Sequence, residues 1–273
     1  MKYFLITILL MVPGWLIPNL VPENRDVELI SIYDQIISEF DEVLSVVPSV
    51  EISQPEDNKE REESFEKNKL EKIKELIIPE KVLLDVDFTS QAPYRNWNYP
   101  WQEFCEEATV LMTMRYIDGR GIDGKDDANN ALHEIMKWEE ENLGFYKDTS
   151  ATTTMKIITD FYQYKNIELN FDISIKKIKE ELALGNLIIL PTAGRALENP
   201  YFTPPGPIYH QIVLIGYNDM EEIFYTNDPG IMSGNSFKYD YQNIIDSVAD
   251  WNYELETINP ERKVMIIVKK LDK

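Results

Sequence analysis

The chain contains a single cysteine, Cys105, and only two histidines, so few residues can carry thiol or imidazole chemistry. Cys105 lies in the first turn of a predicted helix, where unpaired backbone N–H groups and the helix dipole favour the thiolate. Glu106 and Glu107 follow it, and nearby negative charge raises the pKa of a thiol. Because residues i+1 and i+2 do not face residue i on a helix, we expect this effect to be limited. The segment alone fits a nucleophile or a small buried hydrophobic residue equally well.

The second histidine along the chain, His210, begins a predicted apolar strand, and Asp228 closes the next one. Two antiparallel neighbours joined by a turn near residues 218–222 bring these ends together. The carboxylate would then fix the imidazole tautomer and leave Nε2 free to accept the thiol proton of Cys105. The other histidine, His133, lies mid-helix among Glu residues and is predicted to be a surface residue.

These residues need a scaffold, and the hydrophobic pattern predicts helices first and antiparallel strands later, which is an α+β arrangement. Ser and Thr residues at predicted helix starts are suitable caps. Strands are predicted at 82–88, 167–171, 187–190, 208–217, 223–226 and 263–270, and helices at 103–116, about 127–142, 152–164, 174–183 and 241–249.

The N-terminal part differs in composition from the rest of the chain. An apolar run follows Lys2, and residues 1–22 are predicted to be a signal peptide or a membrane anchor, with cleavage left open. Residues 23–80 are predicted to form an acidic helical stalk or linker, and residues 81–273 the globular domain. The protein is therefore expected to be extracytoplasmic, either membrane-anchored or secreted. The alternative is a buried N-terminal helix of a cytosolic protein.

Composition excludes several classes of function. A formal net charge of −21 argues against nucleic acid as a partner. One cysteine excludes an internal disulfide framework and multi-cysteine metal sites. Residues 118–127 fail the EF-hand pattern, and residues 133–137 lack the second histidine of the zincin motif. No phosphate loop or dinucleotide fingerprint is present, so neither a metal nor another cofactor is expected.

Four segments together resemble a known family: Ser90-Gln91, the helix of Cys105, the strand of His210, and Asn227-Asp228-Pro229-Gly230. They resemble the double-glycine cysteine peptidases (peptidase family 39, the bacteriocin-processing type), most closely the stand-alone branch that is not fused to a transporter. The resemblance covers roughly residues 82–270. It implies a papain-like fold with Cys105 as nucleophile, His210 as base and Asp228 as the residue that orients the base.

The resemblance also implies a glutamine that binds the oxyanion beside the backbone N–H of the cysteine. Gln91 fits this role best, and Gln102 is the alternative. Glu106 stands where a glycine is usual in the family. The loop before the cysteine is rich in aromatic residues, which would flank a substrate groove or pack internally. The candidates for the groove are Trp97, Trp101 and Tyr209.

Three functional hypotheses follow. The first is an exported or membrane-tethered cysteine peptidase that acts on a peptide or protein substrate. The second is a catalytically inactive relative that binds envelope peptides, which the acidic residues after Cys105 favour. The third keeps the triad but transfers or hydrolyses another acyl group, as an amidase or a transglutaminase would.

Overall fold

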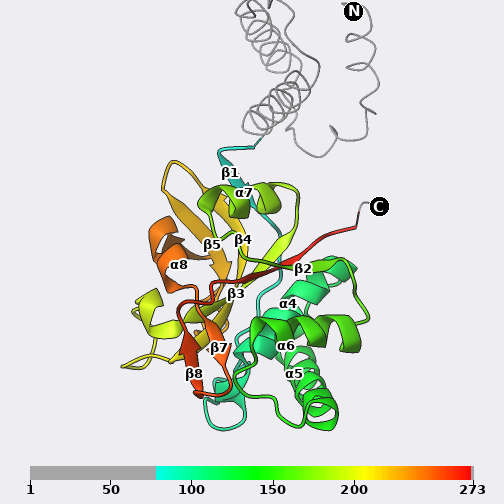
Figure 1. The fold of residues 1–273 in the computed structure, drawn as a ribbon. Coiled ribbons are helices and arrows are strands. Elements are labelled where there is room, and N and C mark those ends of the chain that lie inside the picture. The colour runs from blue at the N-terminus through cyan, green and yellow to red at the C-terminus, as the bar shows by residue number, and fades with distance from the viewer. Residues whose placement is uncertain (1–77, 272–273) are drawn as a thin grey trace, which may run out of the picture. The chain divides into compact units, whose positions relative to one another are not determined.

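The structure, a computed structural model, describes residues 78–271 (Figure 1). The predicted signal or anchor at 1–22 and nearly all of the predicted stalk lie outside the described residues, so both stay predictions. Within residues 78–271, no helix is long and apolar enough to cross a membrane.

An antiparallel sheet forms the centre of the described region. Its strands follow the order β2-β9-β3-β4-β5-β6, and β1 also pairs with β4, beyond the end of β3. A separate hairpin is formed by β7 and β8. The strands are β1 Lys81–Leu83, β2 Ile167–Asn170, β3 Leu187–Ala193, β4 Tyr209–Asn218, β5 Ile223–Asn227, β6 Phe237–Asp240, β7 Asp250–Asn252, β8 Thr257–Asn259 and β9 Met265–Val268.

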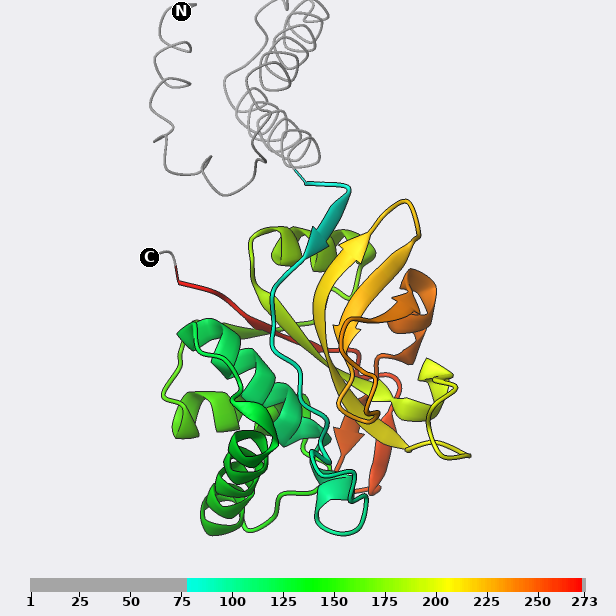
Figure 2. The same cartoon turned by 180° about the vertical axis from the view of Figure 1, so that it is seen from behind.

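Helices cover both faces of this sheet, and Figures 1 and 2 show them from opposite sides. Ser150 and Ser174 cap α6 and α7 through their side-chain oxygens, as their positions before the helices predict. The helices are η1 Trp101–Glu103, α4 Cys105–Asp118, α5 Gly124–Asn142, α6 Ala151–Lys156 with the π-helical turn Ile157–Phe161, α7 Ile175–Ala183, η3 Gly194–Leu197 and α8 Tyr241–Ser247.

Alternation along the central strands creates two hydrophobic cores. Ile189 and Val213 point into a core shared with α4 and α5, whereas Ile188 and Leu214 point into a core shared with α7 and α8. This is the expected geometry of successive side chains on a strand that is buried on both faces. The result is a helix–sheet–helix sandwich, and the predicted α+β class is confirmed.

Some elements differ from those that the hydrophobic pattern predicts. The predicted strand at 82–88 pairs only at its start, as β1, and continues as an extended segment without a strand partner. Strand β6 and the β7–β8 hairpin were not predicted. Each alternates apolar and polar residues over only three or four positions, which is too short for a period of two to stand out in the sequence.

The extended segment after β1 joins the start of the domain to its central strands. β1 crosses close over Gly216, where an added Cβ would lie 2.2 Å from the carbonyl oxygen of Val82. Farther along, the side-chain amide of Asn227 donates to the carbonyl of Val86, at 3.1 Å. The backbone N–H of Gln91 then donates to the carbonyl of Pro229, at 3.0 Å. The segment therefore ends against the loop that follows Asp228.

Candidate active site

Cys105 is the first residue of α4, the helix that packs on the central strand β4. No side chain caps the N-terminus of this helix. The backbone N–H of its first residue has no partner within the helix, and the helix dipole is positive at this end. The thiol is 8% exposed, and the backbone N–H of Gln211, next to His210 in β4, lies close enough to act on it.

The carboxyl group of Glu106 contacts the thiol directly. Cys105 Sγ donates to Glu106 Oε2 at 2.9 Å, and Glu106 Oε1 accepts the backbone N–H of Thr149 at 2.8 Å. The expectation that residue i+1 has little effect on Cys105 is therefore wrong. The reason is that Glu106 is buried and held by the loop before α6, so its side chain does not extend to solvent.

This setting opposes ionisation of the thiol. Burial raises the pKa of Cys105, and the charge and hydrogen bond of Glu106 raise it further, while the N–H of Gln211 acts in the opposite direction. Burial and the nearby Asp148 raise the pKa of Glu106 to about 8. In this arrangement Cys105 is a neutral thiol, and the helix N-terminus alone does not make it a thiolate.

His210 and Asp228 lie side by side, as the strand pairing predicts. β4 and β5 are antiparallel neighbours, and His210 Nε2 is 2.7 Å from Asp228 Oδ1. The prediction that Nε2 stays free is therefore wrong, because the ring presents this nitrogen to the carboxylate. Nδ1 is the ring nitrogen left to accept a proton.

The Asp228 carboxylate receives several hydrogen bonds although it is completely buried. Oδ1 also accepts the backbone N–H of Gly230 at 2.9 Å, and Oδ2 accepts from Tyr239 and Asn199 at 2.6 and 3.0 Å. Burial acts to raise the pKa of Asp228, but His210, Tyr239 and the Gly230 N–H together hold it below its usual value. The group therefore stays ionised and can stabilise an imidazolium.

The imidazole of His210 is enclosed by Phe202 and Gly230. The Phe202 ring meets it edge-on, with centroids 5.3 Å apart. A Cβ at Gly230 would lie 2.8 Å from Cε1 and 3.0 Å from Nε2 of the imidazole, so only glycine fits there. This close approach explains the glycine of the Asp-Pro-Gly sequence.

Comparison with known proteins identifies the domain that carries this arrangement. Residues 83–255 match the model of the Peptidase_C39 like family. The chain belongs to this family. Membership supports cysteine peptidase as its enzyme class.

The solved structures that are similar to this chain include those of two bacterial proteins. One is described as a C39-like peptidase from Bacillus anthracis, with 19% identity and a TM-score of 0.45 over 71% of this chain and 100% of that one. The other is xylellain, a cysteine protease from Xylella fastidiosa, with 15% identity and a TM-score of 0.31 over 71% of this chain and 87% of that one. The search of curated proteins gives no match.

In this C39-like domain the cysteine and the histidine are not hydrogen-bonded. The thiol of Cys105 donates to Glu106, and within the described residues no hydrogen bond links it to His210. The structure therefore joins His210 to Asp228 by a hydrogen bond. Cys105 faces the same strand at the next residue, Gln211.

The two candidate glutamines occupy different places. Gln91 is buried, and its Nε2 donates to the carbonyls of Trp101 and Gln102 at 3.0 and 2.8 Å. Gln102 is exposed, and its side chain instead bonds that of Glu103. Gln91 thus holds the turn just before Cys105, but both N–H groups of its amide already have acceptors.

The three aromatic candidates for a substrate groove differ in their exposure and in their contacts. Tyr209 is 5% exposed and its hydroxyl donates to the carbonyl of Thr149, which argues against a groove role. Trp101 is half-buried and its indole N–H donates to Asn129. Trp97 is 39% exposed and remains available to a substrate. His133 packs edge-on against Trp101, so the prediction of a surface histidine is wrong.

Two further glutamates are buried behind the cysteine. Glu107 on α4 and Glu139 on α5 are fully buried, and their carboxyl groups act on each other. Their four carboxyl oxygens have no hydrogen-bond partner within residues 78–271. Burial, and then the charge of Glu106, raise the pKa of Glu139 to about 9. Burial and the neighbouring acids therefore favour the protonated form of these carboxyl groups over the charged form.

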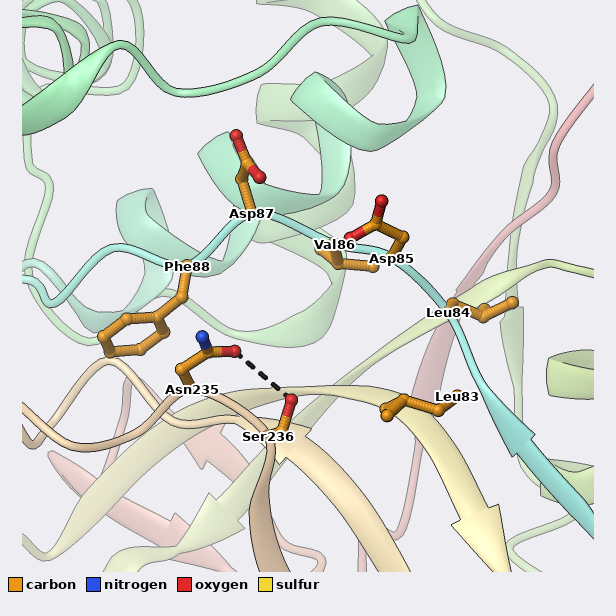
Figure 3. A pocket seen from close by; sticks show the side chains of 8 residues that line it. All are labelled: Leu83, Leu84, Asp85, Val86, Asp87, Phe88, Asn235 and Ser236. Atoms are coloured by element: carbon orange, nitrogen blue, oxygen red, sulfur yellow. Dashed lines mark hydrogen bonds between the residues drawn. The ribbon is translucent and has the colours of Figure 1, made fainter.

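A cavity of about 340 Å³ lies apart from these residues, between the extended segment after β1 and the turn before β6 (Figure 3). Asp85 and Asp87 are on its wall, and Asp87 already accepts the backbone N–H of Ile122. No group of three His, Cys, Asp or Glu side chains within the described part of the chain is arranged to hold a metal ion.

Sequence reasoning missed Glu106 as a contact of the thiol and missed both side chains on Asp228 Oδ2. Tyr239 lies on the unpredicted strand β6, and the spacing of Phe237 and Tyr239 is its only sequence signal. Asn199 lies in the loop after η3, where no pattern distinguishes it from other loop residues.

Proposed function

We propose that this chain is an exported cysteine peptidase that hydrolyses peptide bonds through Cys105, His210 and Asp228. The observation that carries the proposal is the buried His210–Asp228 hydrogen bond of 2.7 Å on the strand that α4 and Cys105 face. A buried imidazole with an ionised carboxylate at Nε2 is a base at Nδ1. The chain's lone thiol is the nucleophile that such a base would serve.

The reaction begins when the thiol turns from Glu106 to His210. The S–H bond breaks and the proton passes to Nδ1, which gives a thiolate and an imidazolium held by Asp228. The sulfur then bonds to the substrate carbonyl carbon, and the carbonyl electron pair moves to oxygen. When the C–N bond breaks, the leaving amine takes the proton from His210. Water, deprotonated by His210, hydrolyses the thioester.

The oxyanion of the tetrahedral intermediate needs preorganised donors. The N–H of Cys105, at the start of α4, is one donor in this proposal, and the amide of Gln91 is the other. Gln91 would exchange one of its two carbonyl acceptors, Trp101 or Gln102, for the oxyanion. Its burial beside the turn before Cys105 supports this assignment over Gln102, whose side chain bonds Glu103 at the surface.

Export is proposed from the apolar N-terminal run after Lys2 and the acidic segment that follows it. The partners in this proposal are a peptide or protein substrate and, through the N-terminal segment, a membrane. Fractionation of cells that express the full chain tests this part. Recovery in the cytosolic fraction would contradict it.

Alkylation of the single cysteine tests the catalytic part. Once the thiol turns from Glu106 to His210, the imidazole can take its proton, so we expect iodoacetamide to react with Cys105 below the ordinary thiol pKa of about 8.5, and His210→Ala to lose this behaviour. His133→Ala is the matched control, because His133 packs on Trp101 and Phe104 but, among the described residues, has no hydrogen bond to Cys105, His210 or Asp228. Release of new N-termini from a peptide library, absent in Cys105→Ala, then identifies a peptidase. Slow alkylation that is independent of His210 would contradict the proposal.

A second candidate function is peptide binding without catalysis. The Cys105–Glu106 hydrogen bond favours it, because it holds the nucleophile as a thiol. In that case the wild type and Cys105→Ala would bind library peptides equally, and neither would release a product. An amidase or transglutaminase activity would instead appear as acyl transfer to an added amine.

A further inference from the structure

We propose that Asn199 and Tyr239 are positioning residues, which keep the Asp228 carboxylate ionised and directed at His210. The inference rests on the proposed function, since it concerns the same histidine and carboxylate. Among the described residues, the side-chain hydrogen bonds of Asn199 and Tyr239 reach Asp228, each other and the Tyr201 N–H, and none reaches the thiol or the imidazole, so we infer that both act through Asp228.

The contacts form a closed triangle at one carboxylate oxygen. Tyr239 donates its hydroxyl to Asp228 Oδ2 at 2.6 Å, and Asn199 Nδ2 donates to the same oxygen at 3.0 Å. Asn199 Nδ2 also donates to the Tyr239 hydroxyl oxygen at 2.7 Å. Each hydrogen bond therefore orients the next, and the carboxylate cannot turn without breaking two of them.

Burial makes these two donors necessary. Asp228 is fully buried, and Tyr239 and Asn199 are 5% and 6% exposed, so bulk water does not solvate Oδ2. A buried carboxylate without donors takes up a proton instead of staying ionised. His210 and the Gly230 N–H occupy the other oxygen, Oδ1. The titratable groups in contact with Asp228 are thus His210 from β4 and Tyr239 from β6.

The same contacts connect the loop after η3 to the base. The Asn199 side-chain oxygen accepts the backbone N–H of Tyr201, and its carbonyl accepts that of Phe202. Phe202 in turn covers the imidazole of His210. Asn199 therefore bonds the Asp228 carboxylate through its side chain, and through its side-chain oxygen and its backbone carbonyl it also holds the loop that carries the Phe202 ring.

The test uses the full chain, in which every alkylation event reports on Cys105. Rates with iodoacetamide are measured from about pH 4 to about pH 9 for Tyr239→Phe and Asn199→Ala. Loss of a donor raises the pKa of Asp228. The acidic limb of the profile, where the alkylation rate falls as the pH is lowered, therefore moves to higher pH by about half a unit or more. At neutral pH the rate falls about threefold to tenfold.

Tyr241→Phe is the matched control, because that buried tyrosine donates to Asp219 at 2.7 Å, outside the site. We expect it to leave the acidic limb in place. Profiles of both variants that superimpose on the wild type would overturn the inference. If Tyr239→Phe does not fold, Asn199→Ala decides the question by itself.

A second measurement separates this inference from the proposed function. The proton on Nε2 of His210 gives a downfield ¹H NMR signal when it is bonded to a carboxylate. We expect Tyr239→Phe to shift or broaden this signal and Tyr241→Phe to leave it unchanged. If Cys105 is alkylated at the same rate in the wild type and in His210→Ala, the peptidase proposal fails. The NMR signal of His210 would still show whether Asn199 and Tyr239 position Asp228. A signal that is unchanged in Tyr239→Phe and in Asn199→Ala would overturn the positioning role of these two residues.

Discussion

Two buried carboxylate environments flank the candidate site, and they differ in the donors they receive. On the sheet side, Asp228 is fully buried, accepts four hydrogen bonds and has a lowered pKa. On the helix side, Glu106 and Glu139 are equally buried but have few donors, and their pKa values rise to about 8 and about 9. The charge of His210 and the donors around Asp228, set against the acidic neighbours of the glutamates, therefore separate the three pKa values although all three groups are buried.

The largest expected effect comes from neutralising the sheet-side carboxylate. Asp228→Asn removes the charge that stabilises the imidazolium and places an amide against the donors of Tyr239 and Asn199. We expect thiol alkylation and any peptide hydrolysis to fall about 10²–10³-fold. Asp250→Asn is the control, because Asp250 is also fully buried but pairs with Arg262. Equal losses of rate in the two variants would mean that Asp228 acts only as a structural residue.

A smaller effect of opposite sign is expected beside the thiol. Glu106→Gln keeps the acceptor for the Thr149 N–H but cannot become negative, so the thiolate is easier to form. Because Glu106 ionises near pH 8, we expect alkylation to become about tenfold faster at pH 8–9 and less so at lower pH. Glu107→Gln, which does not contact the thiol, should change the rate little. A slower reaction in Glu106→Gln would show that the carboxyl assists the thiol.

The smallest effect concerns stability. The pKa of Glu139 in the folded state lies near 9, above that of an unfolded glutamate. The folded protein therefore holds more protons and loses stability as the pH rises from about 5 to about 9. We expect Glu139→Gln to remove this loss and to raise the free energy of unfolding at pH 9 by about 1–2 kcal/mol.

Denaturant unfolding at pH 5 and pH 9 measures this difference. Glu140→Gln, a substitution of the exposed neighbour on α5, is the control and should have no effect at either pH. An equal gain at both values would assign the effect of Glu139→Gln to packing and not to ionisation.

The sequence predicted those parts of the molecule that follow from long periodic segments. The periodic runs predicted α4, α5, β4 and β5, and the strand pairing brought His210 to Asp228 from 18 positions apart. The pattern did not reveal which imidazole nitrogen faces the carboxylate, because this depends on how the ring turns at the strand end. It also did not reveal the Glu106 contact, since the loop at Thr149 that fixes the side chain follows a different helix.

The extended segment after β1 has a mechanical consequence. β1 pairs with β4, and the chain then bonds Asn227 through Val86 and Pro229 through Ser90 and Gln91. Tension applied to the chain ahead of residue 78 would load the bonds at Pro79 and Glu80 and then β1. Once those three pairs yielded, the force would reach the loop that holds Asp228. Strand β1 would thus protect the Asp228 carboxylate, which orients His210, from force applied at the N-terminal side of the domain.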